Sequence, residues 1–221
     1  MYNWAFLVYD IAIDRTAMKL QLQNKKVETI SYLSKKEIGK LFPVVDYRSV
    51  SQVIAPPKNN WVKAQLKDPE SAFAKATRQG SRMHHALETG KTADPFIEQC
   101  LDSFNSEILV DLEELWGQEE WLAHPLGYKG KFDGVGIFRG KLTLFDHKKT
   151  PKRKTAPMLR GWFSQLAAYK QAHEHLYPKH QIEQLAIFNI YGKTADELGT
   201  SVTLLTPKEI ADFTSKFNDL L

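Results

Sequence analysis

Two aspartates and a lysine flank a short turn in the middle of the chain. Asp133 stands before Arg139-Gly140, and Asp146 and Lys148 stand after it, within stretches that alternate like strands. If these stretches form a hairpin over Arg139-Gly140, the two aspartates face each other, and like charges about 5 Å apart destabilise a strand pair. A cation between them removes that cost. Because carboxylate oxygens are hard ligands, the spacing predicts a Mg²⁺ or Mn²⁺ site with Lys148 beside Asp146 on one strand face.

Two structural alternatives compete with a metal site at this hairpin. Arg-Gly is not an ideal two-residue turn, and a bulged three-residue loop would place the two aspartates on opposite faces. Alternatively, Asp146 caps the following turn while Asp133 forms a surface ion pair with Lys131 or Lys148. An isolated D-x-K sequence is common by chance, whereas two acids placed around a hairpin, with a basic segment behind them, favour the metal site.

Two helical segments carry further polar pairs at a spacing of one turn. His84 and Glu88 share a face with Gly80, whose missing side chain allows close approach of a neighbouring element. Gln165 and Tyr169 have the same spacing further along the chain. Taken alone, a histidine and a glutamate so placed are more often a surface pair or a satisfied core histidine than ligands, and the glutamine and tyrosine are uninformative.

The positive charge of the chain is concentrated in one segment. The 221 residues contain 30 Lys+Arg against 26 Asp+Glu, a formal net charge of +4. Between residues 125 and 160 only Asp133 and Asp146 oppose ten basic residues, which are Lys129, Lys131, Arg139, Lys141, Lys148, Lys149, Lys152, Arg153, Lys154 and Arg160. The segment is either a solvated basic face or a surface that contacts phosphates, and the two carboxylates in apolar strands favour the second alternative.

Composition excludes several classes of protein. The single cysteine, Cys100, excludes an internal disulfide and a cysteine-rich zinc site, and it indicates a reducing, cytoplasmic compartment. With 43% hydrophobic and 25% charged residues, the chain is neither disordered nor collagenous. The apolar run 4–9 is too short to cross a bilayer and no basic residue precedes it, so we expect no membrane segment and no signal or transit peptide. The length fits one domain, 1–221, and we expect a monomer.

The hydrophobic periodicity predicts a mixed α/β fold that positions these residues. Residues 1–45 form an N-terminal β-rich extension, with a strand at 4–13, alternation at 18–23, a polar turn at 24–26 and a second strand through Leu33. A short helix follows between the Ser34–Glu37 capping box and Pro43. Residues 46–221 form the core. Its expected elements are helices at 60–89 (divided at Pro69 and Gly80), 95–116 and 158–177, strands at 118–126, 130–148 (a hairpin), 182–191 and 201–205, and a last helix after the Thr206–Glu209 capping box.

Taken together, these motifs resemble the RecB-like branch of the PD-(D/E)xK nucleases, and most closely the mitochondrial genome maintenance exonuclease family with its phage and bacterial relatives. The matching segments follow the family order: Ser49-Val50-Ser51 with Ile54, Gly80 to Glu88, Gly127 to Asp133, Asp146 to Thr150, and Gln165 to Tyr169. The family usually has Thr where Ser51 stands, and here Lys149 separates the D-x-K from Thr150. The resemblance implies a restriction-endonuclease-like core, a mixed central β-sheet flanked by helices, with the small N-terminal β layer added.

The resemblance implies a metal-dependent exonuclease that hydrolyses phosphodiester bonds of DNA. The ligands of one or two Mg²⁺ or Mn²⁺ ions would be His84, Asp133, Asp146 and the main-chain carbonyl of His147. Lys148 would orient or deprotonate the attacking water, or neutralise charge on the phosphate. Glu88 would act as the outer partner of His84 or of the metal, and it counts with Lys148, Asp146 and Asp133 among the catalytic residues.

The same resemblance implies which residues contact DNA. They would be Ser49, Ser51, Lys149, Lys152, Arg153, Lys154, Arg160, Gln165 and Tyr169. Gln165 and Tyr169 would contact the DNA backbone or support the active-site strands, and Trp162, Phe163 or Tyr128 could stack bases, although most aromatic residues must fill the core. The family acts on single-stranded DNA from an end, which implies a single-stranded DNA partner, a role in replication, repair or recombination, and a bacterial or phage-infected host cytoplasm.

Three alternatives to an exonuclease stay open. A non-catalytic nucleic-acid-binding module of the same fold would keep the basic segment without chemistry, and a structure-specific flap endonuclease would not need a free end. A zinc hydrolase could use the seven histidines, but their spacings contain no H-E-x-x-H pattern. Cleavage of a linear single strand but not of a circular one would distinguish an exonuclease from an endonuclease.

Overall fold

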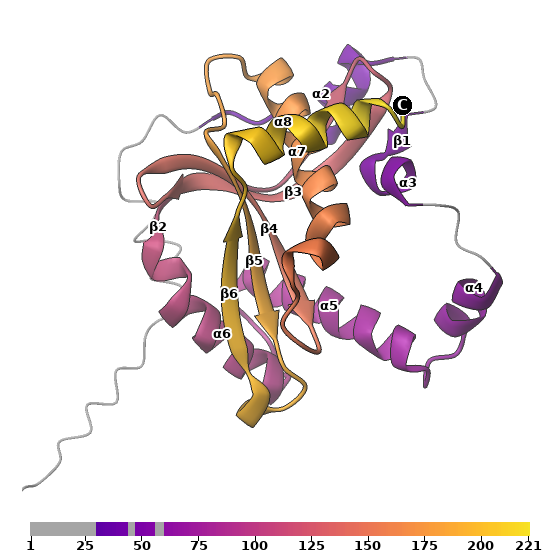
Figure 1. Ribbon diagram of the computed structural model, residues 1–221, viewed down its shortest axis with the longest axis vertical. Coiled ribbons are helices and arrows are strands. Elements are labelled where there is room, and N and C mark those ends of the chain that lie inside the picture. The colour runs from indigo at the N-terminus through magenta and orange to yellow at the C-terminus, as the bar shows by residue number, and fades with distance from the viewer. Residues whose placement is uncertain (1–29, 44–46, 56–59) are drawn as a thin grey trace, which may run out of the picture.

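The computed structural model describes residues 30–43, 47–55 and 60–221 of the chain. They form one six-stranded mixed sheet with helices on both faces, which confirms the predicted mixed α/β class (Figure 1). The strand predicted at 4–13 lies outside the described residues, as does most of 18–33, and residues 30–33 form no strand. Within the described part, none of the helices combines the length and the apolar character needed to span a membrane.

One strand, β3, connects the two halves of the sheet. The strands are β1 (Arg48–Ser49), β2 (Leu112–His124), β3 (Tyr128–Phe138), β4 (Lys141–Thr150), β5 (Gln184–Tyr191) and β6 (Gly199–Leu204). β3 pairs with β2 along one edge, antiparallel. Its other edge is shared between β1, which pairs parallel at Tyr128 and Lys129, and β4, which pairs antiparallel from Gly134 onwards. β4 then continues in parallel with β5, and β6 completes the sheet antiparallel to β5.

The hairpin between β3 and β4 turns over Arg139 and Gly140, as the sequence predicts. Both residues have left-handed backbone conformations, with φ of 51° and 73°, which is the geometry of a tight two-residue hairpin turn. The register has Phe138 opposite Lys141 and Gly134 opposite Phe145, so the bulged three-residue loop is excluded. Beyond Gly134 and Phe145 the two strands separate, and a fork opens between them.

Helices cover the two faces of the sheet with two apolar cores. They are α2 (Lys35–Leu41), α3 (Val50–Ile54), α4 (Asn60–Lys67), α5 (Ala72–Thr89), α6 (Pro95–Glu107), α7 (Arg160–Leu176) and α8 (Pro207–Asn218), with short 3-10 turns at Leu109–Asp111, Ala156–Leu159 and Ala195–Glu197. On one face α3, α7 and α8 pack side chains such as Leu166 and Phe217 against β3, β4 and β5. On the other face α5 and α6 pack Met83, Ile97 and Phe104 against Phe145 and neighbouring strand residues (Figure 1).

The helix starts follow their sequence signals. Ser34 and Glu37 form the capping box of α2, and Thr206 and Glu209 form that of α8, with each serine or threonine hydroxyl accepting a backbone N–H and each glutamate accepting one in return. Pro69 lies between α4 and α5, as predicted. Gly80 does not divide α5, because a glycine weakens a helix by about 1 kcal/mol but removes none of its hydrogen bonds.

The helix predicted at 95–116 is wrong at its C-terminal end. α6 ends at Glu107, and after one 3-10 turn the chain enters β2 at Leu112. The apolar residues Leu112, Leu115 and Trp116 suit either a helix or a strand by spacing alone. The open edge of β3 decides between them, because ten residues of β2 then pair with residues of β3 along that edge.

Candidate active site

The predicted aspartates line the fork where β3 and β4 separate. Gly134 and Phe145 form the last pair of the hairpin, and Asp133 and Asp146 are the next residue on each strand. On the other edge of β3, Gln118 pairs with Gly134 and Glu120 pairs with Phe132, so Glu119 stands opposite Asp133. Three carboxylates from three strands therefore lie in one row across the sheet, at the point where it splits.

His84 approaches this row from α5. Its Nδ1 lies 3.7 Å from Oε1 of Glu119 and 3.7 Å from Oδ2 of Asp133. Possible ligand atoms of these three residues all lie within 4.8 Å of one another, close enough to share one divalent ion. The Gln118 amide donates a hydrogen bond to the Leu87 carbonyl at 3.3 Å, which ties β2 to the same turn of α5. The sequence prediction of His84 and Asp133 as neighbours therefore agrees with the structure, but Glu119 was missed.

Asp146 and Lys148 lie on β4, the second strand of the fork. They point to one face of the strand and form a close ion pair, and Lys148 Nζ lies 5.6 Å from the centre of the Trp162 ring on α7. Asp146 is only 1% exposed. Apart from this ion pair, no hydrogen bond from the described residues reaches either of its carboxylate oxygens. Burying a carboxylate with so few hydrogen bonds costs free energy, and a bound cation would offset that cost.

The environments of Asp133 and Asp146 drive their pKa values in opposite directions. Burial opposes ionisation of Asp133, but the interaction with the His147 side chain and the positive charge of Lys148 outweigh it and lower its pKa. The His147 backbone N–H also donates a hydrogen bond of 2.7 Å to this carboxylate. Burial raises the pKa of Asp146 to about 7, because the attraction of Lys148 offsets only part of the lost hydration and Asp133 adds repulsion. Without a bound cation, ionising both Asp133 and Asp146 therefore costs free energy.

His84 and Glu119 stabilise each other's charged forms. The pKa of His84 is raised mainly by its interaction with Glu119, against the opposing effect of burial. Burial favours the neutral form of Glu119, but His84 and Lys131 together overcome it and lower its pKa. Lys131 Nζ lies 2.6 Å from Oε2 of Glu119. The site therefore holds negative charge that His84, Lys131 and Lys148 compensate.

His147 contacts Asp133 rather than lying at the surface. Its ring is buried among Phe104, Phe145 and Phe188, and its Nδ1 lies 3.6 Å from Oδ2 of Asp133. Together with its backbone N–H, this ring holds the Asp133 carboxylate in place. The assignment of the His147 main-chain carbonyl as a metal ligand stays a prediction.

An open depression of about 510 Å³ gives access to this group from solvent. It is lined by Thr77, Gly80, Ser81, His84, His85, Glu88, Glu119 and Asp133. Glu88 is exposed one turn after His84 and lies outside the group of ligand atoms within 4.8 Å. Its position fits the role that the resemblance implies, that of an outer partner of His84 or of the metal rather than a direct metal ligand. Gly80 leaves open space, since a Cβ atom there would meet nothing within 4 Å.

Gln165 and Tyr169 lie beneath the site. The Gln165 amide donates to the Tyr169 hydroxyl at 3.2 Å, and the Tyr169 ring is buried against Gly130 of β3. A Cβ atom at Gly130 would come within 2.5 Å of that ring. Of the two roles considered, this burial favours support of the active-site strands by Tyr169. Ser49 is the N-cap of α3 and its hydroxyl lies 3.0 Å from that of Ser51, so both serines order the start of that helix.

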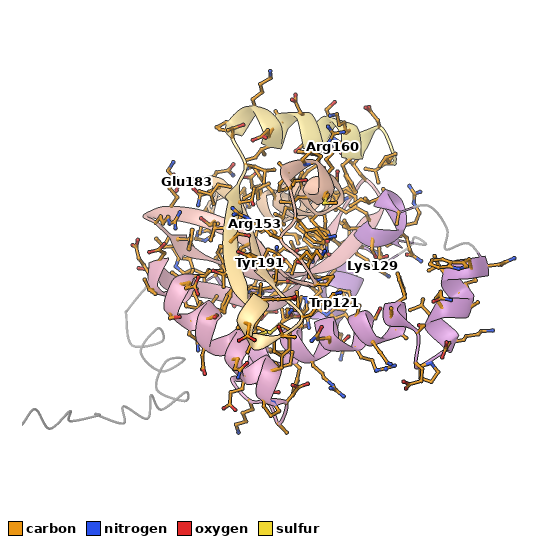
Figure 2. The ribbon with its side chains drawn as sticks, turned by 60° about the horizontal axis from the view of Figure 1, so that its bottom comes forward. Trp121, Lys129, Arg153, Arg160, Glu183 and Tyr191 are labelled. Atoms are coloured by element: carbon orange, nitrogen blue, oxygen red, sulfur yellow. The ribbon has the colours of Figure 1, made fainter. Side chains whose placement is uncertain are left out.

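The predicted DNA-binding cations are not gathered in one place. Lys149 Nζ donates to the Gly192 carbonyl at 2.5 Å and lies over the Phe96 ring, so it is engaged within the protein. Arg160 lines a separate depression that also contains Glu209 and Asp212 of α8. Lys152 and Arg153 are exposed in the loop after β4, and Lys154 is half-buried there. Figure 2 shows Lys129, Arg153 and Arg160 well separated.

The sequence contains little that could have identified Glu119. It lies in a run of acidic residues at 119 and 120, next to a segment predicted to be helical. Its left-handed backbone, with φ of 57°, and its place opposite Asp133 follow only from the register of β2 against β3. The signal that was available is the strand alternation of 118–126, which by itself does not reveal the partner strand.

Comparisons with known proteins give similarity to solved structures alone. No family model matches the chain, and no curated protein does. The protein SSO0001 aligns over 85% of this chain and 84% of its own, at 15% identity and a TM-score of 0.42. A candidate exonuclease from Eubacterium rectale aligns over 99% and 84%, at 12% identity and a TM-score of 0.42. A phage related exonuclease from Haemophilus somnus 129PT aligns over 80% and 91%, at 13% identity and a TM-score of 0.34. Similarity at this level identifies neither a family nor an activity.

Proposed function

We propose that this protein is a metal-dependent nuclease that hydrolyses phosphodiester bonds of DNA. One observation supports this function above all others. Asp133 and Asp146 stand on either side of a fork in the sheet, with Asp133 beside His84 and Glu119, and Asp146 paired with Lys148. Carboxylates, a histidine and a buried lysine around one point are the groups that metal-assisted phosphodiester hydrolysis needs.

The residues fit a hard divalent cation. The donors are carboxylate oxygens and an imidazole, which suit Mg²⁺ or Mn²⁺. Apart from its ion pair with Lys148, the buried Asp146 receives no hydrogen bond from the described residues. Cys100, the one cysteine, is buried in α6 and has no part in this group. A bound ion would polarise the scissile phosphodiester and lower the pKa of a coordinated water from about 16 toward neutrality.

The side chains around the fork would have different roles in hydrolysis. Asp133 and Asp146 would hold the ion from two strands, with His84 and Glu119 completing the set on the α5 side. Lys148 keeps its proton, because the charges of Asp146 and Asp133 raise its pKa against the effect of burial. Its ammonium group would therefore orient the attacking water or neutralise charge on the phosphate rather than act as a base. Glu88 would orient His84 from the open side.

The substrate we propose is single-stranded DNA with a free end, and the activity that of an exonuclease. The depression over His84 is open to solvent, and Lys131 contacts Glu119 in its lining, which suits a flexible strand. A flap endonuclease and a non-catalytic binding module of the same fold are the alternatives. Burying Asp146 beside Lys148 is costly in a protein that only binds DNA, which disfavours the binding module.

The deciding experiment incubates the protein with end-labelled linear single strands and with a circular single strand of the same sequence. We expect Mg²⁺ or Mn²⁺ to support cleavage of the linear strand, EDTA to abolish it, and the circle to resist. Cleavage of the circle would instead identify an endonuclease.

Matched variants complete this experiment. Asp146→Asn and Lys148→Met should each lower the rate at least a hundredfold, about the loss on removing one transition-state group. Asp196→Asn, at an exposed turn, and Lys141→Met, at the exposed start of β4, remove the same charges away from the fork and should retain activity. Undiminished cleavage by both fork variants would show that the chemistry lies elsewhere.

A further inference from the structure

Lys131 occupies the place where a cation would approach Glu119 from the open side. It lies on β3 two residues before Asp133, and its Nζ is 2.6 Å from Oε2 of Glu119. Besides Glu119, the negative charges acting on Lys131 are those of Glu88 and Asp133. The ammonium group thus contacts one carboxylate of the candidate site and is influenced by the charges of two more.

The Glu119 carboxylate faces two ways. Its Oε1 lies 3.7 Å from Nδ1 of His84, within the group that could hold a metal, while Oε2 contacts Lys131. Glu119 also holds a left-handed backbone conformation, φ 57°, in the middle of a strand. A residue other than glycine pays roughly 1–2 kcal/mol for that conformation, and such strain persists where the surroundings enforce it. In this conformation the Glu119 carboxylate contacts both His84 and Lys131.

The side chains of Lys131 and Lys148 differ in how easily they can move away from the carboxylates that they contact. The Lys131 side chain is 39% exposed, whereas that of Lys148 is 18% exposed and lies under Trp162. Lys131 can therefore rotate its four-carbon stem into solvent at little cost. A dication held by Glu119 and Asp133 would repel the adjacent ammonium group, and the phosphate of a bound strand would attract it.

We propose that Lys131 is an electrostatic placeholder: it neutralises Glu119 in the metal-free protein, releases that carboxylate when a divalent cation binds, and then contacts a substrate phosphate. This role rests on the proposed nuclease function. It assigns Lys131 opposite effects on the two ligands, since the lysine competes with the metal but assists the nucleic acid. A lysine that only stabilised the fold, or only attracted DNA, would not have both effects.

Mn²⁺ binding without DNA, measured by titration calorimetry, tests the first half of the role. Lys131→Met should tighten Mn²⁺ binding about two- to fivefold, the factor that an exposed ion pair is worth. Lys129→Met removes the same charge from an exposed position on the same strand and should change the dissociation constant less. In a Glu119→Gln background, Lys131→Met should have no further effect, because the competition is for that carboxylate.

Melting temperatures give a second measurement that does not depend on calorimetric heats. Lys131→Met should lower the melting temperature of the metal-free protein, because Glu119 loses its counter-charge, and should leave the Mn²⁺-loaded protein close to wild type. The stabilisation by Mn²⁺ is then larger in the variant than in the wild type. Unchanged or weaker Mn²⁺ binding by Lys131→Met, with no larger melting shift, would overturn the placeholder role.

The kinetics of strand hydrolysis at saturating Mn²⁺ test the second half. Lys131→Met should raise KM for a single-stranded oligonucleotide severalfold with kcat little changed, and the rise should shrink at high salt. An unchanged KM would overturn the phosphate contact even if Mn²⁺ binds more tightly. Failure of the nuclease function is distinguishable, since it would appear as absent cleavage by the wild type while the Mn²⁺ titrations still show the competition at Glu119.

Discussion

Asp133 and Asp146 are the same residue type at the same fork, yet the structure prepares them for different tasks. Asp133 receives a backbone N–H and the His147 ring, which lower its pKa and hold it as a carboxylate. Asp146 is buried with no hydrogen-bond donor from the described residues except the ion-paired Lys148, and its pKa rises to about 7. Neighbouring acids whose pKa values are driven apart are typical of catalytic sites.

Replacing Asp146 should change how the stability of the metal-free protein depends on pH. Its folded pKa of about 7 lies above the ordinary value of 3.8, so between these values the folded state keeps a proton that the unfolded state has released. Ionisation therefore costs stability as the pH rises through this window. We expect the melting temperature of Asp146→Asn to rise relative to wild type between about pH 4 and about pH 7.

Asp196→Asn, on the exposed turn, serves as the control for this pH series. Taking the difference between variant and wild type removes the contributions of other groups, such as His173, whose pKa burial lowers to about 4. A difference in melting temperature that stays constant from acid to alkaline pH would contradict the raised pKa of Asp146.

Glu119 should matter for metal binding although its position in the sequence gives no hint of it. We expect Glu119→Gln to weaken Mn²⁺ binding about tenfold, a loss typical even of residues that only support a ligand. The matched control is Glu120→Gln, because the Glu120 charge acts instead on Tyr32 and Tyr177. Equal dissociation constants for Mn²⁺ in the two variants, measured by calorimetry, would remove Glu119 from the ligand set.

At the scale of elements, the site depends on how closely α7 approaches β3. Gly130 has no side chain at the point where the Tyr169 ring crosses the strand, and Tyr128 donates its hydroxyl hydrogen to the Ala168 carbonyl on the same helix. Three residues of β3 separate Tyr128 from Phe132, and both side chains are completely buried. The helix therefore packs on the stretch of β3 that leads into Asp133, which pairs with β2 but no longer with β4.

Gly130→Ala should destabilise the fold and disturb the site together. The new methyl group would meet the Tyr169 ring at 2.5 Å in a packed interior, which costs about 1–3 kcal/mol by the usual penalty for overpacking. Urea denaturation measures this loss. Gly161→Ala, in the first turn of α7 with nothing within 4 Å of the new methyl group, should be neutral or slightly stabilising. Equal stability of the two variants would mean that the ring moves aside without cost.

At the scale of the whole molecule, folding disperses the basic segment that the sequence concentrates. Four of its members are bound internally: Lys131 to Glu119, Arg139 to Asp111, Lys148 to Asp146, and Lys149 to the Gly192 carbonyl. Arg139 sits at the hairpin turn, at the far end of β3 from the fork. The cations free to contact a nucleic acid are therefore fewer than the ten counted along the chain.

The salt dependence of DNA binding should reflect this dispersal. In an Asp146→Asn background that binds without cutting, Arg153→Ala should reduce the slope of log affinity against log salt by about 0.7, the value for one phosphate contact on a single strand. Arg139→Ala should leave the slope unchanged, because its guanidinium pairs with Asp111 at 2.7 Å. Filter binding over a salt series measures both. Equal slopes for both variants and their parent would exclude Arg153 from the DNA surface.

Local patterns predict local structure well in this protein. The Arg139-Gly140 turn, the register of the hairpin and the capping boxes of α2 and α8 depend on neighbouring residues, and each is found as expected. The prediction fails at 108–116, where spacing suits both a helix and a strand and the free edge of β3 selects the strand. Gly80 fails as a helix break for a similar reason, since the packing of α5 outweighs one weak residue.

The sequence by itself determined that Asp133 and Asp146 flank a two-residue turn and that Lys148 shares a strand face with Asp146, because strand periodicity and turn chemistry act over a few residues. Only the tertiary structure decided that the strands part at these aspartates and that Glu119 and His84 lie beside Asp133. It also decided that four of the ten basic residues of the segment make internal contacts. Such features depend on pairing between β2 and β3 and on α5 packing against them, and contacts between distant segments leave no periodic trace in a single chain.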